Sequence, residues 1–237
     1  MLETKNKYTV TSSLLLIVCL VLLAGFTESA SAASCLGKSA KTISKTGTVK
    51  LSRYQNVYLT GKRVNVIAEG DNKVCSSTGN IRLSFGRGKS NQANLGSGDD
   101  KVIISSRANS NKINLGGGDD SITIKNKAKE HIIRGGSGDD NIVVAYKANL
   151  TDIDAGSGNN KITLAAKATR QNIVSGDGDD EIVVKELAKT NNRLMKTGLG
   201  NDTVTVDAVG NGTTYLSPKS NPNNLPDTDT YYGNMSN

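Results

Sequence analysis

A five-residue motif rich in glycine and aspartate recurs six times along this chain of 237 residues. The first four intervals between copies are 20 residues long, and the last is 22. The motif begins at Gly96, Gly116, Gly136, Gly156, Gly176 and Gly198. Self-similarity at a constant period is typical of stacked structural units that bury a core only together. This repeat constrains the fold more than any other feature of the sequence.

Two short strands are predicted in each repeat. Two apolar residues follow each motif with one residue between them, as in Val102 and Ile104, and this alternation is typical of a half-buried strand. A second apolar column comprises Ile113, Ile133, Ile153 and Ile173, continued by Leu194 after a one-residue slip. A small residue that fits a tight corner lies between the two strands at Ala108, Ala128, Ala148, Ala168 and Ala188.

Two strands and two corners within 20 residues make one coil of a parallel β-solenoid. We therefore predict an all-β fold, a β-roll or β-helix of about six coils at 95–209, behind an N-terminal cap. Glycine at the first corner permits positive φ angles. The composition agrees with a thin aliphatic core, because the chain has no tryptophan and only two phenylalanines.

The first 32 residues have the three regions of a secretory signal peptide. Lys5 and Lys7 precede an apolar run at 14–23, and the small residues at 30–32 offer a cleavage site. The run is shorter than the ~20 residues that a spanning helix needs, so we expect no transmembrane segment after cleavage. Segment 1–32 therefore predicts export, and we expect a secreted protein that is extracellular or lies at the cell surface.

Removal of the signal leaves two cysteines, Cys35 and Cys75. A single pair in an exported chain favours a disulfide. This bond would tie together the segment 33–94, which we interpret as an N-terminal cap with irregular first coils. Residues 210–237 are rich in Asn, Pro, Thr and Ser, and we interpret them as a C-terminal cap and disordered tail.

The aspartates of the glycine corners form columns once the coils stack. Neighbouring coils place them about one strand spacing apart, where carboxylates repel one another strongly. Calcium accepts carboxylate and carbonyl oxygens in flexible geometry, and the columns have no His or Cys for zinc or copper. Alternatively, these residues serve only as turn formers. The candidate calcium ligands are Asp99, Asp100, Asp119, Asp120, Asp139, Asp140, Asp179, Asp180 and Asp202.

The motif resembles the nonapeptide G-G-x-G-x-D-x-U-x of the repeats-in-toxin family, in which U is apolar. Gly96, Gly98, Asp100 and Val102 fall on its second Gly, fourth-position Gly, Asp and U, while two asparagines replace the acidic pair at 159–160. The resemblance implies a β-roll whose aspartates bind calcium together with corner carbonyls. A weaker similarity to curlin-like repeats of bacterial surface amyloid implies the alternative, a self-assembling fibre subunit.

The outward positions between the apolar pairs form a further column. Its members are Ile103, Thr123, Val143, Thr163, Val183 and Thr205. A flat ladder of this kind suits binding to ice, to a polysaccharide or to another copy of the chain. The alternative is ordinary β-propensity on a solvated strand.

A basic column precedes the corner alanines by one residue, and its members are Arg107, Lys127, Lys147 and Lys167. The chain has a net charge of +7. Such a column suits an acidic polysaccharide or another polyanion, whereas the alternative is a lysine-rich corner that maintains solubility. Besides calcium and a polysaccharide, self-association is the interaction that we expect. We expect no nucleic-acid partner.

Residues for catalysis are scarce. The single histidine, His131, lies beside apolar residues of the second strand, and no Ser-His-Asp or Cys-His arrangement can be assembled. The acids recur in nearly every coil, as a structural motif does. We therefore predict that the protein is not an enzyme. We expect a secreted calcium-binding repeat protein with a binding or structural role at the cell surface or in extracellular matrix.

Overall fold

The computed structural model describes residues 34–168, 171–185, 193–207, 214–216 and 230–233. The predicted signal peptide at 1–32, Ala188 and most of 210–237 lie outside these ranges. The described residues form strands, turns and bends, and none of them belongs to a helix. Within these ranges the chain therefore has no helix of the length and apolar character needed to cross a membrane.

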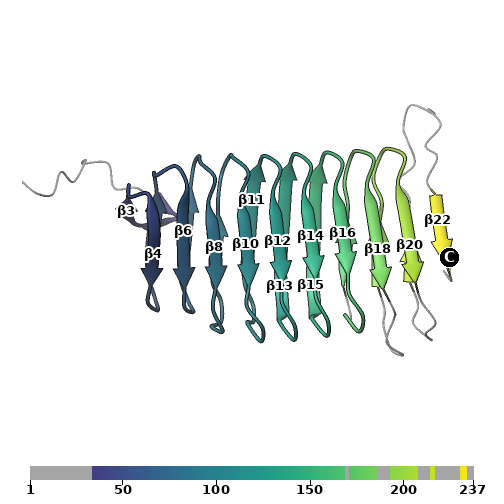
Figure 1. Ribbon diagram of the computed structural model, residues 1–237, viewed down its shortest axis with the longest axis horizontal. Coiled ribbons are helices and arrows are strands. Elements are labelled where there is room, and N and C mark those ends of the chain that lie inside the picture. The colour runs from purple at the N-terminus through teal and green to yellow at the C-terminus, as the bar shows by residue number, and fades with distance from the viewer. Residues whose placement is uncertain (1–33, 169–170, 186–192, 208–213, 217–229, 234–237) are drawn as a thin grey trace, which may run out of the picture. The chain divides into compact units, whose positions relative to one another are not determined.

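Two parallel sheets of ten strands each make up the fold (Figure 1). The even sheet contains β4 (Gly47–Leu51), β6 (Val64–Ala68), β8 (Arg82–Phe85), β10 (Lys101–Ile104), β12 (Ser121–Ile124), β14 (Asn141–Val144), β16 (Lys161–Leu164), β18 (Glu181–Lys185), β20 (Thr203–Asp207) and β22 (Thr230–Gly233). The odd sheet contains β3 (Lys41–Ile43), β5 (Asn56–Leu59), β7 (Lys73–Ser76), β9 (Gln92–Asn94), β11 (Lys112–Gly117), β13 (Lys129–Ser137), β15 (Asn149–Ser157), β17 (Asn172–Val174), β19 (Arg193–Lys196) and β21 (Thr214–Leu216). Because consecutive strands alternate between the sheets, each coil gives one strand to each. The predicted parallel β-solenoid is confirmed.

The solenoid is longer than the six coils that the repeat predicts, because β3 to β9 extend both sheets toward the N-terminus. These first coils are also shorter. Hydrogen bonds between equivalent corners join residues 17 apart from Gln55 to Asn72, 19 apart from Asn72 to Asn91, and 20 apart from Asn91 to Asn111. The coil length thus grows to 20 before the glycine motif begins.

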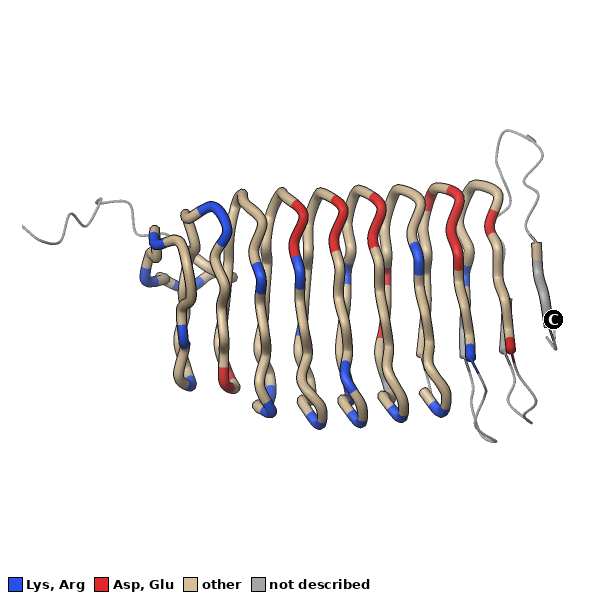
Figure 2. Tube along the Cα trace, in the orientation of Figure 1, with Lys and Arg blue, Asp and Glu red and all other residues tan. Residues whose placement is uncertain are grey.

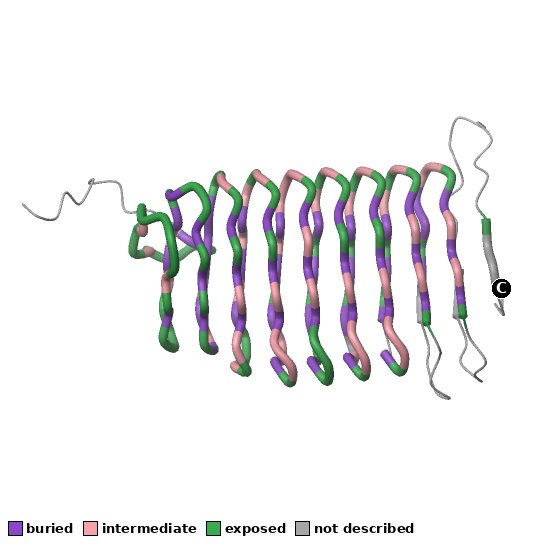
Figure 3. The backbone as a smooth tube through the Cα atoms, in the orientation of Figure 1, coloured by how far each residue is buried: buried purple, intermediate pink, exposed green. Residues whose placement is uncertain are grey.

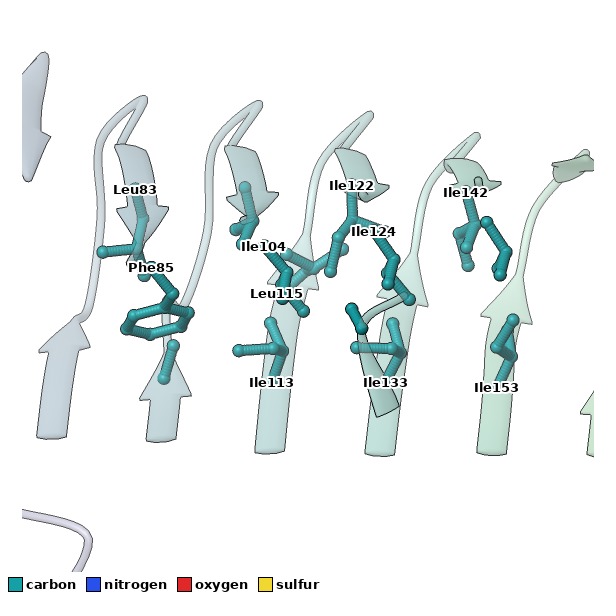
Figure 4. Close-up of a cluster of buried hydrophobic side chains, with 14 of the residues drawn as sticks. Leu83, Phe85, Ile104, Ile113, Leu115, Ile122, Ile124, Ile133, Ile142 and Ile153 are labelled. Carbon is teal, nitrogen blue, oxygen red and sulfur yellow. The ribbon is translucent and has the colours of Figure 1, made fainter. Parts of the chain in front are cut away.

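The core is a ladder of aliphatic side chains between the two sheets (Figure 4). Ile122 and Ile124 of β12 and Ile133 of β13 are completely buried, and buried residues alternate with half-buried or exposed ones along the strands (Figure 3). The corner alanines that the structure describes are also completely buried: Ala108, Ala128, Ala148 and Ala168.

One predicted core position is wrong. Ile173 pairs in register with Met195, which is completely buried, so Met195 and not Leu194 continues the second apolar column. The reason is the longer last coil, in which equivalent residues lie 22 apart, as Asp180 and Asp202 do.

The Cys35–Cys75 disulfide is present, with a Cα–Cα distance of 5.5 Å. Cys35 ends β1 (Ser34–Cys35), which pairs with β2 (Lys38–Ser39) in a short antiparallel hairpin. Cys75 lies in β7, and β1 contacts both β5 and β7. The bond therefore fastens the N-terminal hairpin to the odd sheet.

Candidate functional site

The repeat coils turn at two corners, of which one is rich in acidic residues and the other in basic residues (Figure 2). The acidic corner comprises the glycine motifs at 96–100 and at the equivalent positions, and the basic corner comprises 105–108, 125–128, 145–148 and 165–168. Figure 2 shows acidic residues gathered along one edge of the coils and basic residues along the opposite edge. Glycine is needed at the acidic corner: Gly116 has a φ of 113°, and a Cβ atom there would lie 1.8 Å from the Gly96 carbonyl oxygen.

An outer column of exposed acids follows the acidic corner, comprising Asp99, Asp119, Asp139 and Asp179, with Asn159 between the last two. Each side chain accepts a backbone hydrogen bond from the next coil. The Asp119 N–H donates to Asp99 Oδ1 at 3.2 Å, and the Asp139 N–H donates to Asp119 Oδ1 at 2.9 Å. The outer aspartates therefore link successive turns.

An inner column faces the core and comprises Asp100, Asp120, Asp140, Asn160, Asp180 and Asp202, each at most 2% exposed. Here the hydrogen bonds run in the opposite direction along the stack. The Asp100 N–H donates to Asp120 Oδ1 at 2.6 Å, and the Asp120 N–H donates to Asp140 Oδ1 at 3.0 Å. One carboxylate oxygen is left over in four coils: the Oδ2 atoms of Asp100, Asp120, Asp140 and Asp180 are buried without a hydrogen-bond partner.

Burial makes the inner carboxyl groups weak acids. Desolvation raises the pKa of Asp100 to about 7, that of Asp120 to about 6 and that of Asp140 to about 7, and it also raises the pKa of Asp180. Neighbouring carboxylates of the two columns add to the rise. The side chains of Asp100, Asp120 and Asp140 therefore gain or lose a proton near neutral pH.

The hydrogen bonds of Asn160 show which groups surround the unpaired Oδ2 atoms of the inner aspartates. Its Nδ2 donates to the carbonyl oxygens of Gly158 at 2.9 Å and Ser175 at 3.3 Å. One coil earlier, a Cβ atom at Gly135 would lie 2.1 Å from Asp140 Oδ2 and 2.3 Å from the Ala155 carbonyl oxygen, so these two oxygens occupy one region. An inner aspartate thus points an oxygen toward backbone carbonyls, an arrangement that needs a proton or a cation.

These oxygens have the chemistry that calcium prefers, because carboxylate and backbone carbonyl oxygens are its usual protein ligands. The inner aspartates fit the ion in this respect. The side chains alone are too few, since no group of three or more His, Cys, Asp or Glu among the described residues is placed to hold a metal. Backbone carbonyls would have to complete any shell.

A second inner column lies at the opposite corner, and sequence reasoning missed it. Its buried members are Asn72, Asn91, Asn111, His131, Thr151 and Gln171. The Asn91 N–H donates to Asn111 Oδ1 at 3.0 Å, and the Asn111 N–H donates to His131 Nδ1 at 3.3 Å. Burial lowers the pKa of His131 to about 4, so the ring is neutral at pH 7. The 20-residue spacing of these polar residues was the signal available in the sequence.

The predicted basic column lies on the basic corner, and all four of its side chains are exposed. Each residue has a left-handed backbone: φ is 64° at Arg107, 62° at Lys127, and 58° at Lys147 and Lys167. The turn closes through a backbone hydrogen bond, as from the Ala148 N–H to the Ala145 carbonyl at 3.2 Å. Glycine or asparagine is favoured in this conformation, so a cation in four successive coils is unexpected on conformational grounds.

An aromatic ring lies among these cations. The Nζ atom of Lys147 is 5.0 Å from the centre of the Tyr146 ring, and that of Lys167, one coil further on, is 5.7 Å away. The outward ladder of the even sheet lies between the two corners, and its described members, from Ile103 to Thr205, are partly buried by their neighbours.

No protein-family model matches the chain, and neither a curated protein nor a solved structure matches it.

Proposed function

We propose that this protein is an exported binding or structural component of the cell surface or extracellular matrix, and that its basic corner holds an extended acidic polysaccharide. The supporting observation is the left-handed backbone at Arg107, Lys127, Lys147 and Lys167. Residues other than glycine in this conformation cost free energy and are enriched at functional sites. The recurrence of a cation in this conformation in four consecutive coils supports a use for the charge.

The physics of the corner favours a polymer over a small anion. Parallel strands lie about 4.8 Å apart, so successive cations of the column repel one another. An extended polyanion relieves this repulsion at several coils at once, and Tyr146 adds a flat ring against which a sugar can pack. Binding of this kind weakens as salt screens the charges.

The test changes all four column residues to glycine. Because glycine favours the left-handed backbone, we expect the variant to fold with unchanged or higher thermal stability and to lose most of its salt-sensitive retention on an acidic-polysaccharide resin. The matched control removes four lysines elsewhere on the surface, by changing Lys50, Lys73, Lys112 and Lys196 to Gln. Equal loss of retention in the two variants would contradict the proposal, because net charge alone would then explain the binding.

A second candidate function is calcium binding at the acidic corner. It is supported by the unpartnered, buried Oδ2 atoms of Asp100, Asp120, Asp140 and Asp180 and by the resemblance of the motif to repeats-in-toxin sequences. Bound calcium would supply the positive charge that these oxygens and the nearby carbonyls lack. Asn160 interrupts the column with a neutral amide that donates its own hydrogen bonds.

Isothermal titration of the mature protein with calcium at pH 8 tests this candidate, with magnesium as the comparison. We expect binding at millimolar calcium, and we expect Asp120→Asn, inside the uninterrupted stretch, to weaken it more than Asp202→Asn does. Absence of calcium uptake at millimolar ion would leave the inner column with a purely structural role.

A further inference from the structure

A hollow of about 560 Å³ lies on the outer face of the even sheet, beside the N-terminal end of the acidic corner. Its lining carries charges of both signs: the cations are Arg63, Arg82 and Lys101, and the acids are Asp99, Asp100 and Asp119. Asn80 also lines it. The side chain of Asp100 is buried, and those of the other six residues are exposed. The hollow uses none of the four residues of the basic column, which lie at the other corner.

Two cations adjoin each other in this hollow, and neither forms an ion pair with an acid of the described residues. Arg82 of β8 and Lys101 of β10 are register partners on neighbouring strands. Like charges directly opposite each other destabilise a sheet. Between two described residues the ion pair shown is that of Lys161 with Glu181, and neither Arg82 nor Lys101 pairs with a described acid.

In later coils, the same row of the sheet contains an ion pair. Lys161 of β16 and Glu181 of β18 are also register partners, and their Nζ and Oε2 atoms lie 2.5 Å apart. Positions that form an ion pair in the later coils are therefore both positive in the earlier ones. The arrangement leaves a place for a negative group of a ligand between Arg82 and Lys101.

The acidic residues that line the hollow restrict the charge and the functional groups of that ligand. Asp99 uses Oδ1 to accept the Asp119 N–H, and Asp119 uses Oδ1 to accept the Asp139 N–H. The remaining carboxylate oxygens suit neutral hydroxyl donors and repel further negative charge. Phosphate-rich polymers are disfavoured for this reason. A fitting ligand combines one anionic group with several hydroxyl groups.

We propose that this hollow binds a single carboxylated sugar unit, such as a uronic acid. Its carboxylate lies between Arg82 and Lys101, where the guanidinium offers paired donors, and its hydroxyl groups face Asp99, Asp119 and Asn80. The site is independent of the basic corner, and it gives the even sheet a subsite for one sugar rather than a track for a polymer.

The test titrates the folded mature protein with galacturonate, with a galacturonate tetramer and with a neutral glucose tetramer of equal length. We expect one of the two acidic probes to bind, and the stronger one shows whether the sugar is recognised free or within a polymer. We expect no binding of the neutral tetramer. Lys101→Glu recreates with Arg82 the pairing of Lys161 with Glu181, so it should fold normally and lower affinity at least tenfold.

The control is Lys161→Gln, which removes a lysine charge from the same row and should bind as the unchanged protein does. The four-glycine variant of the basic column should also keep its affinity for galacturonate, which separates this site from the polymer site. Equal binding by the Lys101→Glu variant, equal binding of the neutral tetramer, or equally strong competition by inorganic phosphate would each overturn the proposal.

Discussion

At the scale of single residues, aspartate and asparagine of the inner column act alike through one terminal side-chain atom and differently through the other. Asp140 Oδ1 and Asn160 Oδ1 accept the same kind of backbone N–H, at 3.0 Å in both Asp120 to Asp140 and Asp140 to Asn160. The second atom differs, because Nδ2 of Asn160 donates to two carbonyls whereas Oδ2 of Asp140 has no partner. Asp140 therefore needs a proton that Asn160 does not.

This difference predicts that Asp140→Asn stabilises the protein at pH 8. Burial raises the pKa of Asp140 from 3.8 to about 7, so above pH 7 the folded state holds a buried carboxylate at a cost. Asparagine removes that cost and adds a donor, and we expect the free energy of unfolding at pH 8 to rise by about 1–3 kcal/mol. Urea unfolding of both proteins measures the difference.

The pH dependence provides the control. A carboxyl group with a raised pKa contributes stability that is complete below its unfolded pKa of 3.8 and is lost as pH rises through about 7. The gain from Asp140→Asn should therefore shrink at pH 5. An equal gain at both pH values would contradict the explanation.

The pH dependence from His131 has the opposite sign. Because burial lowers its pKa from 6.5 to about 4, His131 destabilises the fold as pH falls below 6.5.

At the scale of strands and corners, the sequence was informative wherever the period was constant. The alternating pairs such as Val102 and Ile104 predicted the even strands correctly, because a side chain of a solenoid meets its equivalent in the next coil. The coils before residue 95 were harder to place, since their length varies and they lack the glycine motif. Met195 was missed because a longer coil moves the core position.

The candidate sites were predictable in residue type but not in geometry. Recurrent spacing identified the acidic and basic columns. It could not show that Asp100 is buried while Asp99 is exposed, because that depends on which side of the chain turns inward at the corner. The left-handed backbone at Lys127 and the adjoining Arg82 and Lys101 depend on coil length and register, which only the folded structure supplies.

The disulfide between Cys35 and Cys75 leads to a prediction at the same scale. The cysteines are 40 residues apart, and closing such a loop constrains the unfolded chain by roughly 3–4 kcal/mol in the entropy model. Reduction, or Cys75→Ser, should lower thermal stability accordingly. Hydrogen exchange should quicken in β1 and β2 and stay slow in β12, which lies far along the stack. Uniform acceleration in both regions would show that the bond supports the whole solenoid.

At the scale of the whole molecule, the end of the stack decides whether copies join. β3 and β4 are the last strands of their sheets, and no described strand pairs with their outer edges. Open ends of parallel sheets can add another copy head to tail, which is what the alternative role of fibre subunit requires. Lys41 opposes this, because it is exposed at this edge and pairs in register with the buried Val57, so that a stacked copy would bury its charge.

We therefore predict that Lys41→Val promotes end-to-end association, since it continues the apolar column to the exposed edge. The control is Lys50→Val, which adds the same side chain at the position paired with Ile67, on the outer face of the sheet. Sedimentation velocity over a series of concentrations should show larger, elongated species for Lys41→Val alone. If both variants stay monomeric, Lys41 is not what keeps the ends apart. If the unchanged protein already forms elongated species, the role of fibre subunit is favoured over that of a single binding component, because the edge then pairs despite the charge of Lys41.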